Sequence, residues 1–183
     1  MEENQKLVQK GLIRNKYKEI RTSLSRERKK LAERAIFEIL VTALEPYSCI
    51  LSYFSFSDEL SMKKINRHLS STGRLSLPKI QEHSIEVYLV HDIEKELQKN
   101  SHPFLEPNPN LCKKTEAFDC CIVPAIAFDK NYHRVGFGKG YYDRLIEKYP
   151  HVLYIGVGYE EQLVLGSIQR EEHDRCVTKL YLV

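Results

Sequence analysis

The chain has 183 residues, 42% hydrophobic and 29% charged, which is enough to bury one substantial core in a single domain spanning residues 1–183. Its 28 Lys and Arg against 25 Asp and Glu give a net charge of +3, which argues against a nucleic-acid-binding protein. No stretch approaches the roughly 18 apolar residues of a membrane span, and residues 1–6 lack the apolar core of a signal peptide, so we expect a cytoplasmic protein without a membrane partner.

Two amphipathic helices are expected at the start of the chain. Apolar residues within 7–13 indicate the first helix. The second begins after a cap at Ser25, and its apolar residues recur at the helical period. They are Leu31, Ala35, Ile36, Ile39, Leu40, Ala43 and Leu44. Both helices should pack against a sheet.

Basic residues are concentrated in this N-terminal region. Residues 1–34 hold 11 Lys and Arg against 5 acids, a local charge of +6, whereas the remainder of the chain carries −3. Most of these cations are expected on a solvated helix face. The solvated set includes Arg26, Arg28, Lys29 and Lys30. Lys10 and Arg14 differ, because a spacing of four puts them on one side of a helix where they can grip one polyphosphate; the alternative is a surface pair of like charges.

Strands and helices then alternate along the rest of the chain. Strands are predicted at Ser48–Tyr53, Arg74–Leu77, Ile85–Val90, Phe118–Val123, Val152–Val157 and Lys179–Leu182, and helices near 60–70, 92–99, 141–149 and 160–165. The segment Ser101–Asn110 contains three prolines and is expected to be an ordered loop or a hinge. This alternation predicts a single α/β domain with a mostly parallel sheet flanked by helices on both faces.

The run from Arg134 to Asp143 is the strongest local motif. Glycines at 136, 138 and 140 let backbone N–H groups converge on an anion without interference from Cβ atoms. The run follows a predicted strand and precedes a predicted helix, so an anion there would also face a helix N-terminus. The spacing excludes a Walker loop and the dinucleotide fingerprint. The alternative is a glycine-rich turn with a solvated Lys139.

Cysteines and histidines give no sign of a metal centre. The five cysteines include no Cys-x-x-Cys pair, and the seven histidines lack zinc spacing. We expect reduced thiols that pack as small hydrophobes, with catalysis or metal binding as the less favoured interpretation.

The segment Val123–Asp129, followed by Arg134–Asp143, closely resembles the signature of the 5-formyltetrahydrofolate cyclo-ligase family, also called 5,10-methenyltetrahydrofolate synthetases. The resemblance extends over most of the chain in the order of the family. Its outlying matches are Lys10, Arg14, Glu59, Leu77-Pro78-Lys79, Glu106-Pro107 and His173-Asp174. Ala125 stands where the family usually has Gly, which raises the question of a close backbone turn at this position.

The resemblance implies an enzyme that uses ATP and Mg²⁺ to convert 5-formyltetrahydrofolate to 5,10-methenyltetrahydrofolate through a phosphorylated formyl group, releasing ADP and phosphate. It implies catalytic roles for Arg134 and Lys139 and magnesium ligands at Asp143 and Asp174. The implied ATP-binding residues are Lys10, Arg14, Arg134, Gly136, Gly138, Lys139, Gly140, Tyr141 and Tyr142. The implied folate-binding residues are Phe54, Glu59, Phe137 and Tyr141.

Several alternatives stay open at this stage. Tyr142 can equally pack against the sheet, Glu59 and Asp143 can be ordinary acids at helix starts, and Asp174 can be structural. Lys79 can meet the folate glutamate tail, a phosphate or only solvent. The competing functions are a nucleic-acid-binding module that uses the basic N-terminal helix and a sugar-phosphate or acyl-CoA enzyme with a phosphate loop. We expect a monomer whose partners are ATP and the folate.

Overall fold

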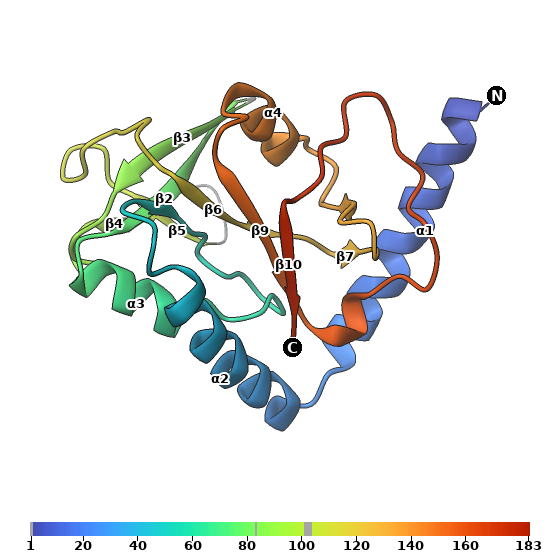
Figure 1. Cartoon of the computed structure of the whole chain (residues 1–183), viewed down its shortest axis with the longest axis horizontal. Coiled ribbons are helices and arrows are strands. Elements are labelled where there is room, and N and C mark those ends of the chain that lie inside the picture. The colour runs from blue at the N-terminus through green and yellow to red at the C-terminus, as the bar shows by residue number, and fades with distance from the viewer. Residues whose placement is uncertain (1, 83, 101–103) are drawn as a thin grey trace.

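A six-stranded sheet forms the centre of the molecule (Figure 1). The computed structural model describes residues 2–82, 84–100 and 104–183. The order across the sheet is β10 (Lys179–Leu182), β9 (Leu153–Gly158), β6 (Cys120–Pro124), β1 (Ile50–Leu51), β2 (Leu75–Gln81) and β3 (Ser84–Leu89). Neighbouring strands are parallel except β2 and β3, which form an antiparallel pair at one edge. The predicted, mostly parallel sheet is confirmed.

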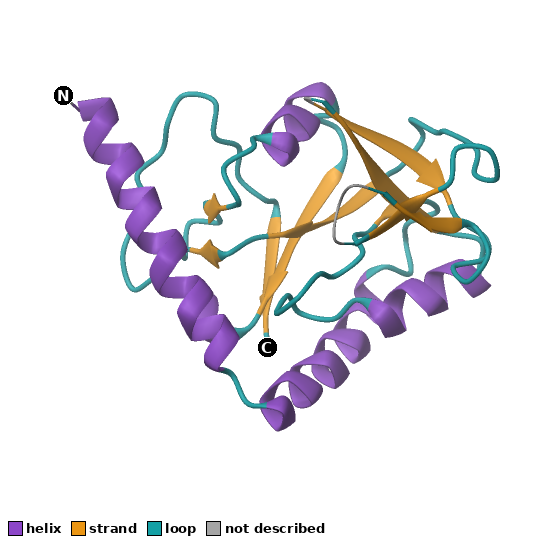
Figure 2. Ribbon diagram, turned by 180° about the vertical axis from the view of Figure 1, so that it is seen from behind, coloured by secondary structure: helices purple, strands orange, loops and turns teal. Residues whose placement is uncertain are grey.

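Helices cover both faces of this sheet, as predicted. Side chains alternate along β6, so Cys120 and Ile122 join the core under α2 (Arg26–Ala43) and α3 (Lys63–Ser71), whereas Cys121 and Val123 join the core under α4 (Tyr141–Lys148). Figure 2 shows α2 and α3 along one side of the sheet and α4 on the other. The predicted cap of α2 is confirmed, because the Oγ of Ser25 accepts the N–H of Arg28 at 3.1 Å.

Helix α1 (Glu2–Ser23) does not lie on the sheet (Figure 1). It packs against the short ribbon of β7 (Ala127–Phe128) and β8 (Arg134–Val135) and against the 3-10 turn η1 (Glu160–Gln162). A separate apolar cluster joins α1 to the ribbon and to the segment after η1, with Tyr17 and Ile13 on the helix side. The ribbon, which our sequence analysis missed, carries the chain from the end of β6 into the glycine run.

Two predicted helices are wrong. Residues 92–99 form a turn followed by β4 (Leu97–Lys99), which pairs with β5 (Leu105–Pro107) inside the segment predicted as a loop or hinge; residues 101–103 of that segment lie outside the described chain. The carboxylates of Asp92 and Glu96 accept four backbone N–H groups in this turn, so side chains replace the hydrogen bonds of a helix. The helix expected at 160–165 is only the single turn η1.

The cysteines behave as expected for small hydrophobes. All five are free thiols, and three of them are buried. Burial raises the pKa of Cys112 to about 11 and that of Cys120 to about 12, so both thiols stay protonated at neutral pH. Within the described residues, no helix has the length and hydropathy needed to cross a membrane.

The prediction of a solvated Arg28 is wrong. Its Nε and Nη2 donate to the two carboxylate oxygens of Glu161 at 2.7 and 2.8 Å, and Nη2 also reaches the backbone oxygen of Val183 at 2.6 Å. A planar guanidinium can make this fork to a carboxylate, and the partner lies 133 residues away along the chain. Arg28 therefore ties α2 to η1 and to the end of the chain.

The buried carboxylate of Asp129 organises the turn between β7 and β8. It is fully buried and accepts the N–H groups of Asn131 at 2.8 Å and His133 at 3.0 Å, together with the ring Nδ1–H of His133 at 2.9 Å. The oxygen that accepts the ring N–H of His133 also accepts the backbone N–H of Ile168, at 2.9 Å. One side chain thus joins the ribbon that leads to the glycine run and the segment that leads to Asp174.

Asp129→Asn should destabilise the fold by about 2–3 kcal/mol at pH 7, because an amide cannot accept on both sides and leaves buried N–H groups unpaired. Burial raises the pKa of Asp129, but the hydrogen bonds from Ile168 and His133 outweigh burial and hold the pKa below its usual value. A lowered folded pKa means that this stabilisation is present above the unfolded pKa of about 3.9 and is lost as the pH falls through the folded value. Urea denaturation at pH 7 and at descending pH measures both effects.

Asp92→Asn is the matched control, since Asp92 also accepts backbone N–H groups in a turn but its side chain is 37% exposed. Asp92→Asn should lower the free energy of unfolding by less than Asp129→Asn does. Equal losses in the two variants, or a difference that does not change with pH, would contradict the role assigned to Asp129.

Candidate active site

A cavity of about 530 Å³ lies beyond the carboxyl ends of β1, β2 and β6. In open α/β sheets this edge is where ligands bind. All of the predicted site residues line it: Lys10, Arg14, Phe54, Glu59, Arg134, Gly136, Phe137, Gly138, Lys139, Gly140, Tyr141, Tyr142, Asp143 and Asp174. Residues far apart in the sequence therefore meet at one site, as predicted.

The glycine run forms one wall. Gly138 has φ +90° and Gly140 has φ +65°, a left-handed conformation that L side chains rarely adopt. A Cβ on Gly138 would lie 3.4 Å from the guanidinium of Arg14, whereas one on Gly140 would lie 2.7 Å from that of Arg144 and would require this side chain to move. Gly140 directly precedes α4, so the N-terminus of this helix opens onto the cavity.

Four of the Lys and Arg side chains that line the cavity lie at this wall, and three of them make hydrogen bonds or ion pairs within the protein. Arg14 donates from Nε to the backbone oxygen of Gly136 at 2.8 Å. The nearly buried ammonium of Lys10 contacts Glu171 and Asp174, the latter at 2.5 Å. Arg134 pairs with Asp143 and also reaches the backbone oxygen of Arg175. In the part of the chain that the structure describes, the ammonium of Lys139 has neither an ion pair nor a hydrogen bond.

The two predicted metal ligands have different surroundings. One oxygen of Asp143 accepts Nη2 of Arg134 at 2.9 Å and the N–H of Arg175 at 3.0 Å, so this carboxylate also fastens the segment after Asp174 to α4. Asp174 is grouped instead with Glu171 and His173, whose ligand atoms all lie within 4.8 Å of one another. Burial raises the pKa of Asp174, but the hydrogen bond and charge of Lys10 together with the hydrogen bond from the N–H of Glu171 outweigh burial, so the pKa lies below its usual value.

Glu171 belongs to this group although no motif in the sequence indicated it. It lies three residues before Asp174, and the two residues form a tight turn in which the N–H of Glu171 donates to the Asp174 carboxylate at 2.7 Å. An acid at this distance from a candidate ligand is a weak signal, because many exposed turns contain one. Only the fold shows that both carboxylates face Lys10.

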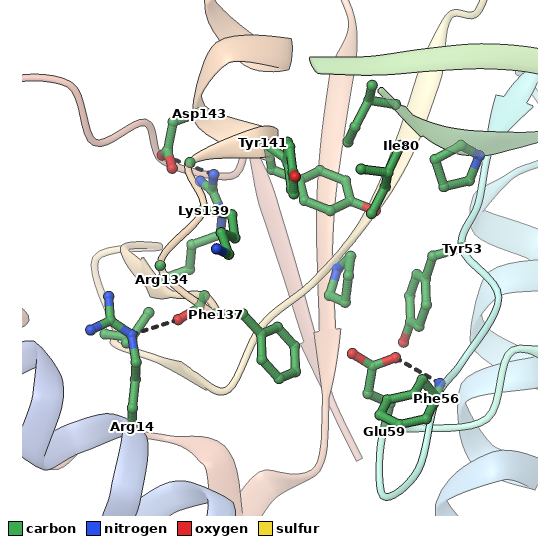
Figure 3. A pocket seen from close by; sticks show the side chains of 18 of the residues that line it. Arg14, Tyr53, Phe56, Glu59, Ile80, Arg134, Phe137, Lys139, Tyr141 and Asp143 are labelled. Atoms are coloured by element: carbon green, nitrogen blue, oxygen red, sulfur yellow. Dashed lines mark hydrogen bonds and ion pairs between the residues drawn. The ribbon is translucent and has the colours of Figure 1, made fainter. Parts of the chain in front are cut away.

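The opposite end of the cavity is aromatic and contains one acid. Glu59 is half-buried, its Oε2 accepts the N–H of Phe56 at 2.9 Å, and burial raises its pKa above the usual value. Phe56 meets Phe104 edge to face, with 6.3 Å between ring centroids. Figure 3 shows Arg14, Arg134 and Lys139 on one side of the cavity, Tyr53 and Glu59 on the other, and the ring of Phe137 between them. The side chain of Phe137 is 51% exposed, so its face is accessible.

The structure bears on two of the open alternatives. Tyr142 packs on the apolar cluster under α4 as well as lining the cavity, so its packing role is confirmed. The alternative of a solvated Lys79 is wrong, because its side chain is 12% exposed and its ammonium lies 3.7 Å from the buried carboxylate of Glu106. Lys79 is not among the residues that line the cavity. Glu106 also accepts the N–H of Ile80 at 2.9 Å, so this pair holds β5 against β2 and places the neighbouring Leu105 on the cavity wall.

The backbone at Ala125, where the family usually has Gly, makes no close turn that requires glycine. Ala125 does not adopt a positive φ, since among described residues other than glycine only Ser57, Glu82 and Tyr132 do. Its buried backbone oxygen accepts Nε2 of Gln162 at 2.8 Å and Nη1 of Arg21 at 3.2 Å. The chain therefore needs no glycine at this position.

Comparison with known proteins agrees with this architecture. The model of the 5-formyltetrahydrofolate cyclo-ligase family matches residues 6–182. The chain belongs to this family. A 5-formyltetrahydrofolate cyclo-ligase of Haemophilus influenzae is 27% identical over 158 residues, which cover 82% of this chain and 84% of that protein. The resemblance in the sequence is therefore confirmed.

Two solved members of the family share the fold. The 5,10-methenyltetrahydrofolate synthetase of Aquifex aeolicus superposes with a TM-score of 0.80 at 28% identity, covering 93% of this chain and 88% of that one. The synthetase of Mycoplasma pneumoniae gives a TM-score of 0.74 at 23% identity, covering 93% and 96%. At that lower identity the likeness shows the fold alone. The cyclo-ligase fold thus extends over nearly the whole chain.

Proposed function

We propose that this chain is an ATP-dependent ligase that closes 5-formyltetrahydrofolate to 5,10-methenyltetrahydrofolate and releases ADP and phosphate. The observation that carries the proposal is one cavity whose two ends suit the two substrates, in a chain that belongs to the cyclo-ligase family. The end with the glycine run suits a polyphosphate, and the aromatic end with Glu59 suits a flat heterocycle.

The proposed chemistry has two steps. A formyl oxygen is a poor leaving group, so it first attacks the γ-phosphorus of ATP; a new O–P bond forms and the bond to the ADP oxygen breaks. The N10 atom of the folate then attacks the activated formyl carbon and loses its proton. Phosphate departs and takes the former formyl oxygen with it. Phosphoryl transfer needs alignment of the two reactants and compensation of charge more than covalent help from the protein.

The residues at the glycine-run end suit that requirement. Gly136 to Gly140 and the start of α4 present backbone N–H groups, and Arg14 and Arg134 are held in place by hydrogen bonds to the protein. Lys139, which has no partner in the described chain, is the cation best suited to follow the transferring phosphoryl group. Preorganised donors of this kind are each typically worth about 3 kcal/mol in the transition state.

The acids on the cavity wall fit a magnesium ion. Asp143, Asp174 and Glu171 offer carboxylate oxygens, the ligand type that magnesium prefers, and the lowered pKa of Asp174 keeps its carboxylate ionised. When bound, the ion would neutralise part of the polyphosphate charge. In our proposal Asp143 and Asp174 hold it, with Glu171 beside them.

Glu59 is proposed to recognise the pterin ring. Its carboxylate can accept the amino and ring N–H groups of the heterocycle, while Phe137, Phe54 and Tyr141 offer aromatic surface for stacking. We propose that the protein works as a monomer in the cytoplasm. The nucleic-acid alternative is weakened, because Lys10 and Arg21 of the basic region are buried in ion pairs and Arg28 pairs with Glu161.

Purified protein with 5-formyltetrahydrofolate, ATP and Mg²⁺ should form the methenyl product, followed by its near-ultraviolet absorption. Lys139→Ala should lower kcat/KM about 100-fold, because a preorganised charge is lost from the transition state. Its thermal transition should stay close to that of the wild type, since Lys139 makes no ion pair in the described structure. Lys130→Ala, an exposed lysine in the nearby turn, is the control and should keep full activity. A wild-type protein that forms no product would refute the proposal.

Binding of 5-formyltetrahydrofolate should weaken as the pH falls through the pKa of Glu59. Burial raises this pKa, so protonation occurs at a higher pH than for an ordinary glutamate, and the protonated group accepts fewer hydrogen bonds. Glu59→Gln should bind about 10- to 100-fold more weakly at neutral pH and lose this dependence. Calorimetric titration with the folate alone at several pH values measures this, with exposed Glu38→Gln as the control. Unchanged affinity in Glu59→Gln would remove Glu59 from the site.

A further inference from the structure

We propose that Arg21 is a positioning residue that sets the shape of the folate end of the cavity by tying the Glu59 loop, the end of β6 and Phe137 to helix α1. The inference rests on the proposed function for the identity of the ligand at that end. Arg21 itself does not line the cavity, so it acts through the groups that it holds.

Three contacts of one buried guanidinium carry the inference. Arg21 is only 2% exposed, and its Nε and Nη2 donate to the two oxygens of Asp58 at 2.8 and 3.0 Å. Its Nη1 donates to the backbone oxygen of Ala125, just beyond β6, at 3.2 Å. The guanidinium carbon also lies 6.0 Å from the centre of the Phe137 ring. A single side chain thus touches three separate parts of the cavity surroundings.

Arg21 acts on the loop that carries Glu59, whose backbone oxygen also accepts the hydroxyl of Tyr159 at 3.4 Å. Between β1 and α3 the chain has no helix or strand, and Ser57 adopts a positive φ of 55°. Asp58 faces α1, where Thr22 also donates to it at 3.2 Å, whereas the next residue, Glu59, lines the cavity. The side chain of Asp58 therefore points to α1 and that of Glu59 points to the cavity. Holding Asp58 in place also holds the backbone that carries Glu59.

The geometry requires arginine rather than any cation. The fork of a guanidinium reaches two carboxylate oxygens and a third acceptor at once, which a lysine ammonium on a flexible stem cannot reproduce. Arg21→Lys therefore keeps the charge but loses the fixed arrangement. The glycine-run end has anchors of its own on the same helix, because Lys10 contacts Asp174 and Arg14 contacts Gly136. Loss of the Arg21 fork should disturb the folate end selectively.

The test is steady-state kinetics of Arg21→Lys and Asp58→Asn with both substrates. Each variant should raise the KM for 5-formyltetrahydrofolate about tenfold, while kcat and the KM for ATP change less than about twofold, because small misplacements of a binding group weaken one substrate. The double variant should be no worse than the more impaired of the two single variants, since both substitutions disrupt the same Arg21–Asp58 pair. An unchanged KM for the folate, or an equal rise in both KM values, would overturn the inference.

Arg28→Lys is the matched control. Arg28 also forks onto a carboxylate, that of Glu161, and also reaches a backbone oxygen, but it does not line the cavity and has no hydrogen bond or ion pair with Asp58 in the described structure. It should lower the thermal transition without changing either KM. If Arg28→Lys raised the folate KM as much as Arg21→Lys did, the effect would be general loosening of the fold and the inference would fail.

A second readout does not depend on turnover. Hydrogen–deuterium exchange of residues 53–60 should be faster in Arg21→Lys than in the wild type or Arg28→Lys. A wild type without cyclo-ligase activity would refute the proposed function, while this measurement would still decide whether Arg21 orders the loop; unchanged exchange would overturn the inference. If Arg21→Lys does not fold, Asp58→Asn, which alters only the partially exposed partner, carries the same comparison.

Discussion

One face of helix α1 holds the cavity together. Lys10, Arg14, Tyr17 and Arg21 follow the spacing of a single helical face, and each donates a hydrogen bond to a different segment. The partners are the turn with Asp174, the glycine run, the backbone after η1 and the Glu59 loop. These segments have little regular structure of their own, so their relative positions depend on a helix that lies outside the sheet.

The apolar and the polar contacts of α1 have different roles. The cluster around Ile13, Tyr17 and Ile20 removes apolar surface from water and stabilises the packing of α1 against the ribbon and the segment after η1. Buried ion pairs add little net stability, because removing their charges from water is costly. The ion pairs of Lys10 and Arg21 instead fix the positions of two loops, since each cation meets its partner carboxylate only when the loop that carries it is correctly placed.

Local patterns in the sequence predicted the parts of the site that local chemistry determines. The glycine run needs left-handed backbone at Gly138 and Gly140, and the parallel sheet follows from apolar strands alternating with helices. Long-range pairs were invisible, because nothing near Arg21 or Arg28 in the sequence indicates a partner 37 or 133 residues away. The helix predicted near 92–99 was wrong for the opposite reason. Its composition suits a helix, but the carboxylate of Asp92 accepts two nearby backbone N–H groups and so stabilises a turn.

The shared support has a consequence for the proposed reaction. The formyl oxygen and the γ-phosphorus must approach to about 3–3.5 Å, so small errors in their alignment are costly. Arg14 at the glycine run and Arg21 at the folate loop are seven residues apart on α1, a distance of roughly 10 Å along the axis at the rise of an α-helix. A helix holds such a separation far better than two independent loops can, because its hydrogen bonds fix every residue between them. Alignment of two substrates thereby depends on the rigidity of two helical turns.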